Sequence, residues 1–346
     1  MSAEAPIRYR AYRYSGGSVS ITDEVLSRSR LTQQHGKVVL VEPRYVGICS
    51  ADVRELAGER PGKCDFGHEI VGTVLESTHT GYATGQHVAL NPFCRVTRET
   101  AFAEVMYVAG PADLLDSALL RVPTDSMELS AVEPLACVIH AARQSQVKDR
   151  GSVLVFGAGF FGYLLYCYLG FKGIPVMLAN RTRERLDHLR KRVDDKGLDP
   201  IFLAAPVERC IGHFSTVFLT NARLSQADVS SAVNLVHDDG EIILFGALDP
   251  ADAALYTIRN QQQRRRWALE SKSHLGSKNY FLQGTLDATP ADLQESVKTL
   301  SQPQFARRLA AIFAPPLTFE QGAAHLNQRV RSRQSYEKYV VSLNTH

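Results

Sequence analysis

A thiol, an imidazole and a carboxylate occur within one short part of the chain. Cys49 follows a hydrophobic run, and His68 and Glu69 come nineteen and twenty positions later, inside the stretch GHEIVG. These three groups are ligands that zinc takes in proteins, and a catalytic zinc keeps one position open for water or substrate. No CxxC or HxxxH spacing surrounds the residues, which excludes a finger-type site. The pattern therefore predicts one catalytic metal centre.

Each of these residues has a simpler interpretation when it is taken alone. A free cysteine is usually a small buried hydrophobic side chain, and a single histidine more often packs in a core than binds a metal. The combination favours the metal site, because Cys49 ends one predicted strand and His68 opens the next. Both side chains are then expected at the ends of strands, where they can meet.

A second group of residues fits the binding of a dinucleotide. Gly157, Gly159 and Gly162 have GxGxxG spacing and stand between an apolar run and an amphipathic helix, as a dinucleotide-binding turn requires. The first glycine allows a tight turn, the second lets a pyrophosphate approach the backbone, and the third lets the helix pack on the strand. Phe160 and Phe161 open this helix, whose free N–H groups face the phosphates. The alternative is a glycine-rich turn in an unrelated α/β domain.

The residues after the second strand of this unit predict which dinucleotide binds. NAD sites carry Asp or Glu here, and the carboxylate accepts hydrogen bonds from the ribose. In this chain Asn180 replaces the acid, and Arg181, Arg183 and Arg185 follow it. Without a carboxylate nothing repels a 2′-phosphate, and a guanidinium offers it a bidentate partner. NADP(H) is therefore predicted in preference to NAD(H), unless the arginines only open a solvated helix.

Two kinds of structure must position these groups. Up to about residue 125, short β-branched runs alternate with glycine and proline, which is typical of an antiparallel, barrel-like β domain. Residues 130–145 have helical apolar spacing, with Ser130 as the expected N-cap. From about residue 151, apolar strands alternate with helices, so a parallel sheet covered on both faces is expected. The tail adds one predicted helix over residues 290–301.

The bulk composition excludes several classes of function. A chain of 346 residues predicts about two domains, and its 39 basic and 36 acidic residues leave a net charge of +3. No strong field attracts nucleic acid or membrane, and the basic run over residues 264–267 is interpreted as a solvated face. Six scattered cysteines indicate free thiols in a reducing compartment. The apolar window over residues 160–171 is too short to cross a bilayer and the N-terminus has no apolar signal segment, so a cytoplasmic protein is expected.

Four motifs, in this order, resemble those of one family: GICSADV, GHEIVG, VEPLACVIHA and VLVFGAGFFG. They are similar to the motifs of the zinc-dependent medium-chain dehydrogenases/reductases, specifically the alcohol and polyol dehydrogenases, and DDGEIILFG and Lys338 extend the similarity. The resemblance implies an α/β protein with a GroES-like β-barrel catalytic domain over residues 1–143 and a C-terminal return over 281–346. It implies a Rossmann domain with a doubly wound parallel sheet over residues 144–280, with nicotinamide and substrate in the interdomain cleft.

The resemblance also implies roles for individual residues. Cys49 and His68 match zinc ligands, and Glu69 matches a residue that either binds the metal or exchanges with substrate or water. Glu133 matches the third protein-ligand position, where polyol dehydrogenases have a glutamate that binds zinc directly or through a water molecule. Cys137, one helical turn later, is interpreted as core packing.

The chain departs from the family pattern in two places. The four clustered cysteines of a structural zinc lobe are missing and Cys94 stands alone there, so one catalytic zinc and no structural zinc is expected. The usual hydroxyl donor to the alcohol is replaced by Ala51. The neighbouring Ser50 is a candidate catalytic residue, although on an extended segment it is expected to point the other way. The proton route is left open among Glu69, Glu133 and zinc-bound water.

The predicted reaction is reversible hydride transfer between NADP(H) and a secondary alcohol/ketone pair, with zinc as the Lewis acid. The segments ICSADVRELAGER and LGSKNYF resemble the ribitol 5-phosphate dehydrogenases, which favours a polyol, sugar or sugar phosphate as the small-molecule substrate. Two alternatives stay open: a family member that reduces an activated C=C or imine bond without catalytic use of zinc, and a non-catalytic dinucleotide-binding protein. By family analogy the protein is a homodimer or a homotetramer.

Overall fold

The computed structural model describes residues 5–59, 66–145, 151–198, 203, 210–248, 270–275, 278–332 and 337–343. The chain divides into two compact units. The first comprises Met1–Glu133, Ser296–Ser301 and Phe313–His346, and the second comprises Pro134–Glu295 and Gln302–Ile312. The basic run over residues 264–267 and the cysteine at position 64 lie outside the described residues.

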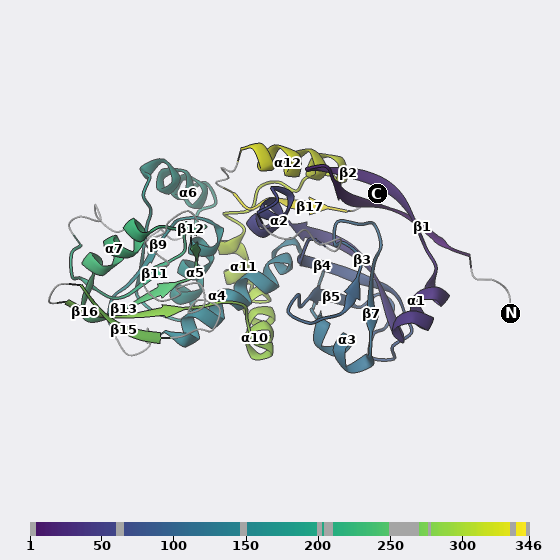
Figure 1. The fold of residues 1–346 in the computed structure, drawn as a ribbon, viewed down its shortest axis with the longest axis horizontal. Helices are drawn as coiled ribbons and strands as arrows, with labels where there is room; N and C mark the ends of the chain where they lie inside the picture. The colour runs from purple at the N-terminus through teal and green to yellow at the C-terminus, as the bar shows by residue number, and fades with distance from the viewer. Residues whose placement is uncertain are drawn as a thin grey trace. The chain divides into compact units, whose positions relative to one another are not determined.

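An antiparallel sheet forms the centre of the first unit (Figure 1). Its strands follow the order β6 (Thr97–Arg98), β7 (Met106–Gly110), β3 (Lys37–Gly47), β4 (Glu69–Ser77), β5 (His87–Leu90) and β8 (Leu119–Arg121), and β17 (Val340–Ser342) also pairs with β3. All these pairings are antiparallel. Val39, Val41 and Val46 of β3 are fully buried, and such β-branched side chains fit a pleated surface. The predicted antiparallel β domain is confirmed.

A hairpin of β1 (Ile7–Ser15) and β2 (Ser18–Leu26) is joined to this sheet through Tyr12. The Tyr12 N–H donates to the Phe102 carbonyl at 2.8 Å, and the two rings stack with centroids 5.2 Å apart. The Tyr12 hydroxyl donates to the carbonyl of Phe319, and the Tyr12 side chain is fully buried. One aromatic residue therefore links the hairpin, the loop before β7 and the C-terminal helix in a single core.

Short helices complete the first unit. They are α1 (Arg28–His35), α2 (Ser50–Leu56), α3 (Ala112–Ala118), the 3₁₀ turn η1 (Met127–Ala131) and α12 (Phe319–Arg331). Thr318 caps α12, because its hydroxyl accepts the Gln321 N–H while the Gln321 side chain accepts the Thr318 N–H. The N-cap predicted at Ser130 is wrong: Ser130 lies inside η1, its hydroxyl donates to the Met127 carbonyl at 2.7 Å, and α4 (Val132–Gln144) begins two residues later.

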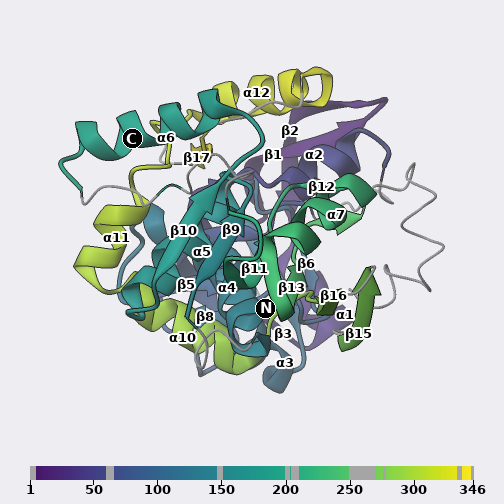
Figure 2. The same ribbon diagram turned by 90° about the vertical axis from the view of Figure 1, so that its left-hand side faces the viewer.

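A mostly parallel sheet forms the centre of the second unit. Its order is β10 (Val176–Ala179), β9 (Val153–Phe156), β11 (Phe214–Leu219), β13 (Val236–Leu244), β16 (Lys278–Gly284) and β15 (Glu270–Leu275). The first five strands are parallel and β15 pairs antiparallel at the edge; Figure 2 shows β10, β9 and β11 side by side. Every residue of β9 and β11 is buried, as a parallel sheet covered on both faces requires. The Rossmann-type sheet is confirmed.

Helices separate these parallel strands along the chain. They are α5 (Phe160–Phe171), α6 (Arg183–Asp195) and α7 (Gln226–Leu235). The helices α10 (Pro290–Leu300) and α11 (Pro303–Leu309) follow the last strand of the sheet, and β12 (Arg223–Leu224) and β14 (Ala247–Leu248) form a small separate pair. Eight of the twelve residues of α5 are buried, so its apolar sequence belongs to the core. In the part of the chain that the structure describes, no helix is long and apolar enough to cross a membrane. The helix predicted over 290–301 is confirmed by α10.

Candidate metal centre and dinucleotide turn

Cys49 lies at the junction of a strand and a helix. β3 ends at Gly47, and Cys49 is the N-cap of α2, where its Sγ accepts the Ala51 N–H at 3.4 Å. The Cys49 N–H donates in turn to Asp52 Oδ2 at 2.9 Å. This capping starts a helix, so the extended segment expected at Ser50 is wrong. Ser50 occupies the first position of α2 with an exposed side chain, and its catalytic role stays a prediction.

His68 and Glu69 lie at the start of β4. Glu69 is the first residue of that strand and pairs with Gly47 at the end of β3, which brings its side chain to the strand end that precedes Cys49. His68 is oriented by Asp52, whose Oδ1 lies 3.5 Å from His68 Nδ1 and accepts the Gly67 N–H at 3.1 Å. Asp52 is almost fully buried and was not predicted as a site residue. The signal for it in the sequence is its position three residues after Cys49, the spacing of a helix capping box.

Cys49, His68 and Glu69 form one compact donor group. One ligand atom of each, the thiol sulfur, an imidazole nitrogen and a carboxylate oxygen, lies within 4.8 Å of the others. Glu69 is fully buried, and its Oε1 has no hydrogen-bond partner among the described residues. A buried carboxylate oxygen in this state is destabilised unless a cation or donor meets it. A thiol, an imidazole and an unsatisfied carboxylate together fit zinc.

Lys338 contacts the same carboxylate from the C-terminal segment. Its Nζ forms an ion pair with Glu69 Oε2 and donates to the Ile48 carbonyl at 3.1 Å, although only 4% of the residue is exposed. Gly47 is needed beside this pair, because a Cβ there would collide with the Glu69 carboxylate and the Lys338 side chain. The ion pair occupies one oxygen of Glu69 and leaves the other for a metal or a proton.

Without a metal, the surroundings of the site favour the protonated forms of both Cys49 and His68. Burial, and then the Glu69 carboxylate, raise the pKa of Cys49. Burial alone would lower the pKa of His68, but the Asp52 carboxylate outweighs it and raises that pKa well above its usual value. Burial opposes the ionisation of Asp52, yet its partners His68, Cys49 and Gly67 hold its pKa below the usual value. Metal binding must therefore displace protons from the thiol and the imidazole.

Two predicted residues on α4 lie outside this group. Glu133, in the first turn of α4, is 8% exposed, and it does not belong to the described set whose ligand atoms lie within 4.8 Å of one another. Its role as a direct or water-mediated ligand stays a prediction. Cys137, one turn later, is partly buried.

The loop that replaces the cysteine-rich lobe is held by a different set of contacts. The Cys94 thiol accepts a hydrogen bond from Asn91 Nδ2 at 3.2 Å. Glu99 is buried, and its carboxylate binds Arg13 through two contacts of 2.6 and 2.9 Å and accepts the Tyr9 hydroxyl at 2.6 Å. An ion pair with the N-terminal hairpin therefore anchors this loop. Among the described residues, the only cysteine that shares a possible metal site with two other ligands is Cys49.

The three glycines of the predicted turn have the geometry that the motif requires. Gly157 has φ +121°, and a Cβ there would meet Thr220 and Asn221. A Cβ on Gly162 would fall on the Gly157 carbonyl, so α5 can approach the turn only because this position is glycine. Gly159 is the N-cap of α5, before Phe160 and Phe161, and its open side is limited only by Arg185. The open side leaves room for a pyrophosphate at the helix N-terminus.

Asn180 follows the last residue of β10, as expected, and braces the glycine turn. Its Oδ1 accepts the Ala158 N–H at 3.0 Å, and its Nδ2 donates to Thr182. Arg185 Nη1 lies 3.5 Å from the position that a Cβ on Gly159 would take. The two other predicted arginines are more exposed and lie near carboxylates: Arg181 Nε is 3.9 Å from Asp228, and Arg183 Nε is 3.6 Å from Asp187. The structure thus places one guanidinium at the turn and two on the surface beside it.

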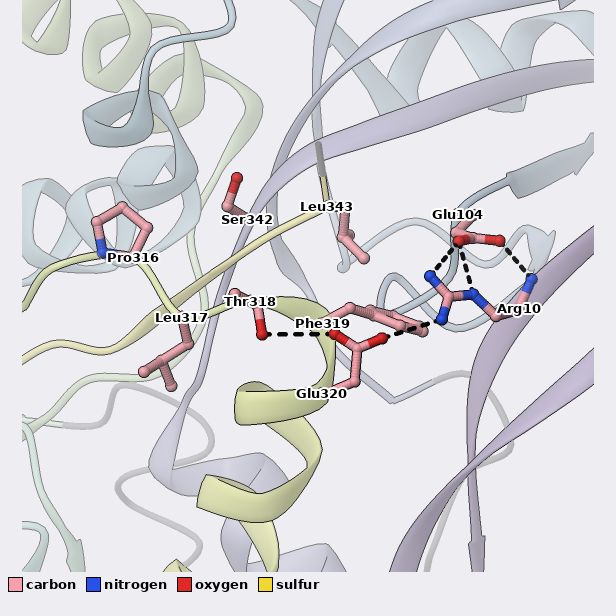
Figure 3. A pocket seen from close by; sticks show the side chains of 9 residues that line it. All are labelled: Arg10, Glu104, Pro316, Leu317, Thr318, Phe319, Glu320, Ser342 and Leu343. Carbon is pink, nitrogen blue, oxygen red and sulfur yellow. Dashed lines mark hydrogen bonds and ion pairs between the residues drawn. The ribbon is translucent and has the colours of Figure 1, made fainter. Parts of the chain in front are cut away.

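The first unit also has a surface pocket of about 580 Å³, lined by a different set of residues (Figure 3). The C-terminal strand and the start of α12 line it, with Arg10 and Glu104 on one side and Glu320 on the other. Arg10 is already bound to both carboxylates, at 2.8 Å to Glu104 and 2.9 Å to Glu320. None of the predicted site residues lines this pocket.

Comparisons with known proteins found relatives of similar sequence and a solved structure of similar fold. Residues 35–112 match the alcohol dehydrogenase GroES-like domain. L-galactonate-5-dehydrogenase of Escherichia coli is 25% identical over 231 residues, which cover 60% of this chain and 68% of that protein. "Probable D-xylulose reductase A" of Arthroderma otae is 30% identical over 184 residues, so the match covers 44% of this chain and about half, 51%, of that protein.

A solved structure shares the fold over almost the full length. The crystal structure of S. aureus TarJ in complex with NADPH superposes with a TM-score of 0.69 and 16% sequence identity, covering 97% of this chain and 99% of that one. At this identity the likeness establishes the fold. The superposition covers both central sheets of this chain, the antiparallel one and the parallel one.

Proposed function

The chain belongs to the zinc-dependent medium-chain dehydrogenases, and we propose that it transfers hydride reversibly between NADP(H) and the secondary alcohol/ketone pair of a polyol or sugar. The observation that carries the proposal is the group of Cys49, His68 and Glu69, whose ligand atoms lie within 4.8 Å of one another, with Cys49 and Glu69 buried and His68 partly buried. Sulfur, nitrogen and carboxylate donors at this spacing, with the buried Oε1 of Glu69 unsatisfied among the described residues, support a metal site.

A zinc ion at this site would act on the charge of the substrate oxygen. Zinc held by these three residues would supply a Lewis acid for the substrate oxygen. The chain itself fixes the donors: Asp52 holds the His68 ring through Nδ1, and the α2 N-terminus holds Cys49. Lys338 forms an ion pair with Oε2 of Glu69 and does not occupy Oε1. Because Ala51 has no hydroxyl, we assign the substrate proton to Glu69, Glu133 or water.

The cofactor preference is proposed from the glycine turn and its neighbours. The end of β10 carries an amide at Asn180 in place of the carboxylate that an NAD site uses. Arg185 reaches the turn at Gly159, and the side chains of Arg181 and Arg183 are 62% and 82% exposed, free to rotate toward a bound phosphate. Guanidinium groups bind phosphate through two parallel hydrogen bonds. NADP(H) is therefore the proposed cofactor.

The substrate class is proposed from the relatives. L-galactonate and D-xylulose, named for the two matched proteins, are polyhydroxylated compounds with a secondary alcohol or a ketone at the carbon that could react. The alternative reaction, reduction of an activated C=C bond, is favoured by the loss of the hydroxyl at Ala51. A substrate panel that includes both ketoses and enones separates the two reactions.

Metal analysis of the purified protein tests the proposal. We expect about one zinc per chain, NADPH-dependent reduction of a ketose, and loss of both zinc and turnover in Cys49→Ala. Cys94→Ala, which removes a partly buried thiol outside the donor group, is the matched control and should keep both. Thermal shifts should be larger with NADPH than with NADH, because tighter binding stabilises the folded state more. A metal-free enzyme with full ketose activity, or turnover of enones alone, would overturn the proposal.

A further inference from the structure

Arg329 is a charged residue for which neither the fold nor the proposed chemistry gives a role. It lies on α12, which packs against α2 and β17. The residue is partly buried, its Nε is inaccessible to solvent, and no hydrogen bond or ion pair satisfies that atom among the described residues. A guanidinium removed from water without an acceptor destabilises the protein unless an anion meets it.

A series of contacts connects the part of α12 around Arg329 with the residue before Cys49. One turn earlier on α12, the His325 ring lies 4.0 Å from the Tyr339 ring, and His325 Nε2 is also buried without a partner in the described part. The Tyr339 carbonyl accepts the Ile48 N–H at 2.9 Å, and Lys338 donates to the Ile48 carbonyl. Ile48 immediately precedes Cys49. The segment that carries Tyr339 is therefore hydrogen-bonded to the residue next to the candidate ligand cysteine.

Electrostatic effects agree with this placement. Burial lowers the pKa of Arg329, while the Tyr339 hydroxyl and the Cys49 thiol act in the opposite direction. Burial, and then Arg329, lower the pKa of His325. The geometry agrees: Arg329 follows His325 by one helical turn, and α12 packs against α2, whose N-cap is Cys49.

The charges at the site show what Arg329 lacks. The buried Lys338 is matched by Glu69, and Asp52 is matched by His68 and two backbone N–H groups. Arg329 has no carboxylate of its own among the described residues. A neutral polyol offers only hydroxyl groups, whereas a phosphate or a carboxylate offers the paired oxygens that match a guanidinium.

We propose that Arg329, assisted by His325, binds the anionic group, phosphate or carboxylate, of a polyol substrate whose reacting carbon lies at the Cys49–His68–Glu69 centre. The inference rests on the proposed function and narrows its substrate class to polyol phosphates or sugar acids. Arg329 then determines specificity and takes no part in the hydride step. Its Nε and the buried Nε2 of His325 are the donors offered to the anion.

Matched substrates and variants test the inference. The panel is ribitol, ribitol 5-phosphate and ribonate, with sorbitol, sorbitol 6-phosphate and gluconate as a second series. We expect the wild type to prefer one anionic member, phosphate or carboxylate, and Arg329→Gln to lower kcat/KM for it by about 10- to 100-fold, mainly through KM. The neutral polyol should change by less than about 2-fold. Arg329→Lys should recover part of the loss, and Arg331→Gln, at an exposed position of the same helix, should behave as wild type.

A binding measurement decides the case without turnover. Inorganic phosphate, added at constant ionic strength to the NADP-saturated, zinc-loaded enzyme, should stabilise the wild type and Arg331→Gln, and should not stabilise Arg329→Gln. Equal phosphate stabilisation of wild type and Arg329→Gln, or equal losses for neutral and anionic substrates, would mean that Arg329 only balances the Cys49 thiolate. Turnover of neutral polyols without any anionic preference would overturn this inference alone. Absence of turnover with every polyol would overturn the proposed function, and phosphate binding would then decide the role of Arg329 by itself.

Discussion

Asp52 Oδ1 lies 3.5 Å from His68 Nδ1, and the same carboxylate accepts the backbone N–H groups of Cys49 and Gly67. One buried side chain therefore fixes the position of the ligand thiol and the orientation of the ligand imidazole. The three contacts come from a helix start and from the segment that leads into β4, so Asp52 connects the two parts of the chain that supply the metal ligands.

Asp52→Asn should weaken zinc binding. The amide keeps the size of the side chain but loses the negative charge that orients and polarises the His68 ring, and such partners of ligand histidines are worth about 10- to 100-fold in metal affinity. Competition with a chromophoric chelator measures the zinc dissociation constant directly. Asp116→Asn, which removes a surface carboxylate bound to His79, is the control. Unchanged affinity in Asp52→Asn would show that the backbone alone holds the ligands.

Removal of the Lys338 charge should destabilise the protein through Glu69. Lys338→Met leaves a fully buried carboxylate without its ion-pair partner, which costs about 3–5 kcal/mol in comparable cases. A thermal midpoint lower by roughly 10 °C is expected for the metal-free protein. The double variant Lys338→Met/Glu69→Gln should recover most of the loss, since it removes both charges. If the double variant is as unstable as Lys338→Met, the lysine acts through packing instead.

The Glu99 anchor should make stability depend on pH in the acid range. Burial opposes the ionisation of Glu99, but Arg13, Tyr9 and the Thr100 N–H hold its pKa below the usual glutamate value. A carboxylate with a lowered folded-state pKa stabilises the protein above its unfolded pKa of about 4.3, and this contribution is lost as the pH falls through the lower folded-state value.

The comparison of wild type with Glu99→Gln measures this contribution. The difference in the free energy of unfolding should be largest near neutral pH and should shrink steadily below about pH 4. Urea unfolding at a series of pH values gives the curve. Asp23→Asn, at an exposed position of the neighbouring β2, should show no such convergence. A difference that stays constant down to the acid limit would contradict an ionic role for Glu99.

The parts of this protein that could be predicted from its sequence are those with local signals. The strands before and after Gly157, the turn itself and the Cys49–His68–Glu69 group follow from periodicity and residue type. The helix start at Ser50 could not be foreseen, because it depends on an Asp52 side chain that turns back to the Cys49 N–H. Tertiary contacts likewise set the burial of Glu99.

The C-terminal segment shows the same limit more clearly. β16, α11 and α12 were not predicted, although α12 is amphipathic; its packing partners α2 and β2 lie far away in the chain. Only the family resemblance singles out Lys338 in the sequence, and Arg329 is one of several arginines in a basic stretch. Long-range pairing of β17 with β3 brings Lys338, two residues before β17, to Glu69. No local pattern encodes that pairing.

Cofactor preference should follow the side chains at the end of β10. Asn180→Asp places a carboxylate where an NAD site has one; it keeps the hydrogen bond from the Ala158 N–H but introduces repulsion toward a 2′-phosphate. Arg185→Gln removes the guanidinium that reaches the turn at Gly159. Each variant should weaken the binding of NADPH by about 10- to 100-fold, the usual range for loss of a hydrogen bond to a charged group.

Binding of the reduced dinucleotides, followed by their fluorescence, checks both variants. Asn180→Asp should also increase the affinity for NADH, because the new carboxylate accepts hydrogen bonds from the ribose hydroxyls. Arg185→Gln should change the affinity for NADH by less than about 3-fold if the guanidinium binds the 2′-phosphate. Equal losses of NADPH and NADH in Arg185→Gln would instead place the guanidinium on the pyrophosphate, which both dinucleotides share. Arg190→Gln, further along α6 and close to Asp187, is the control for a general change in surface charge. The ratio of the two losses therefore assigns Arg185 to one phosphate or the other.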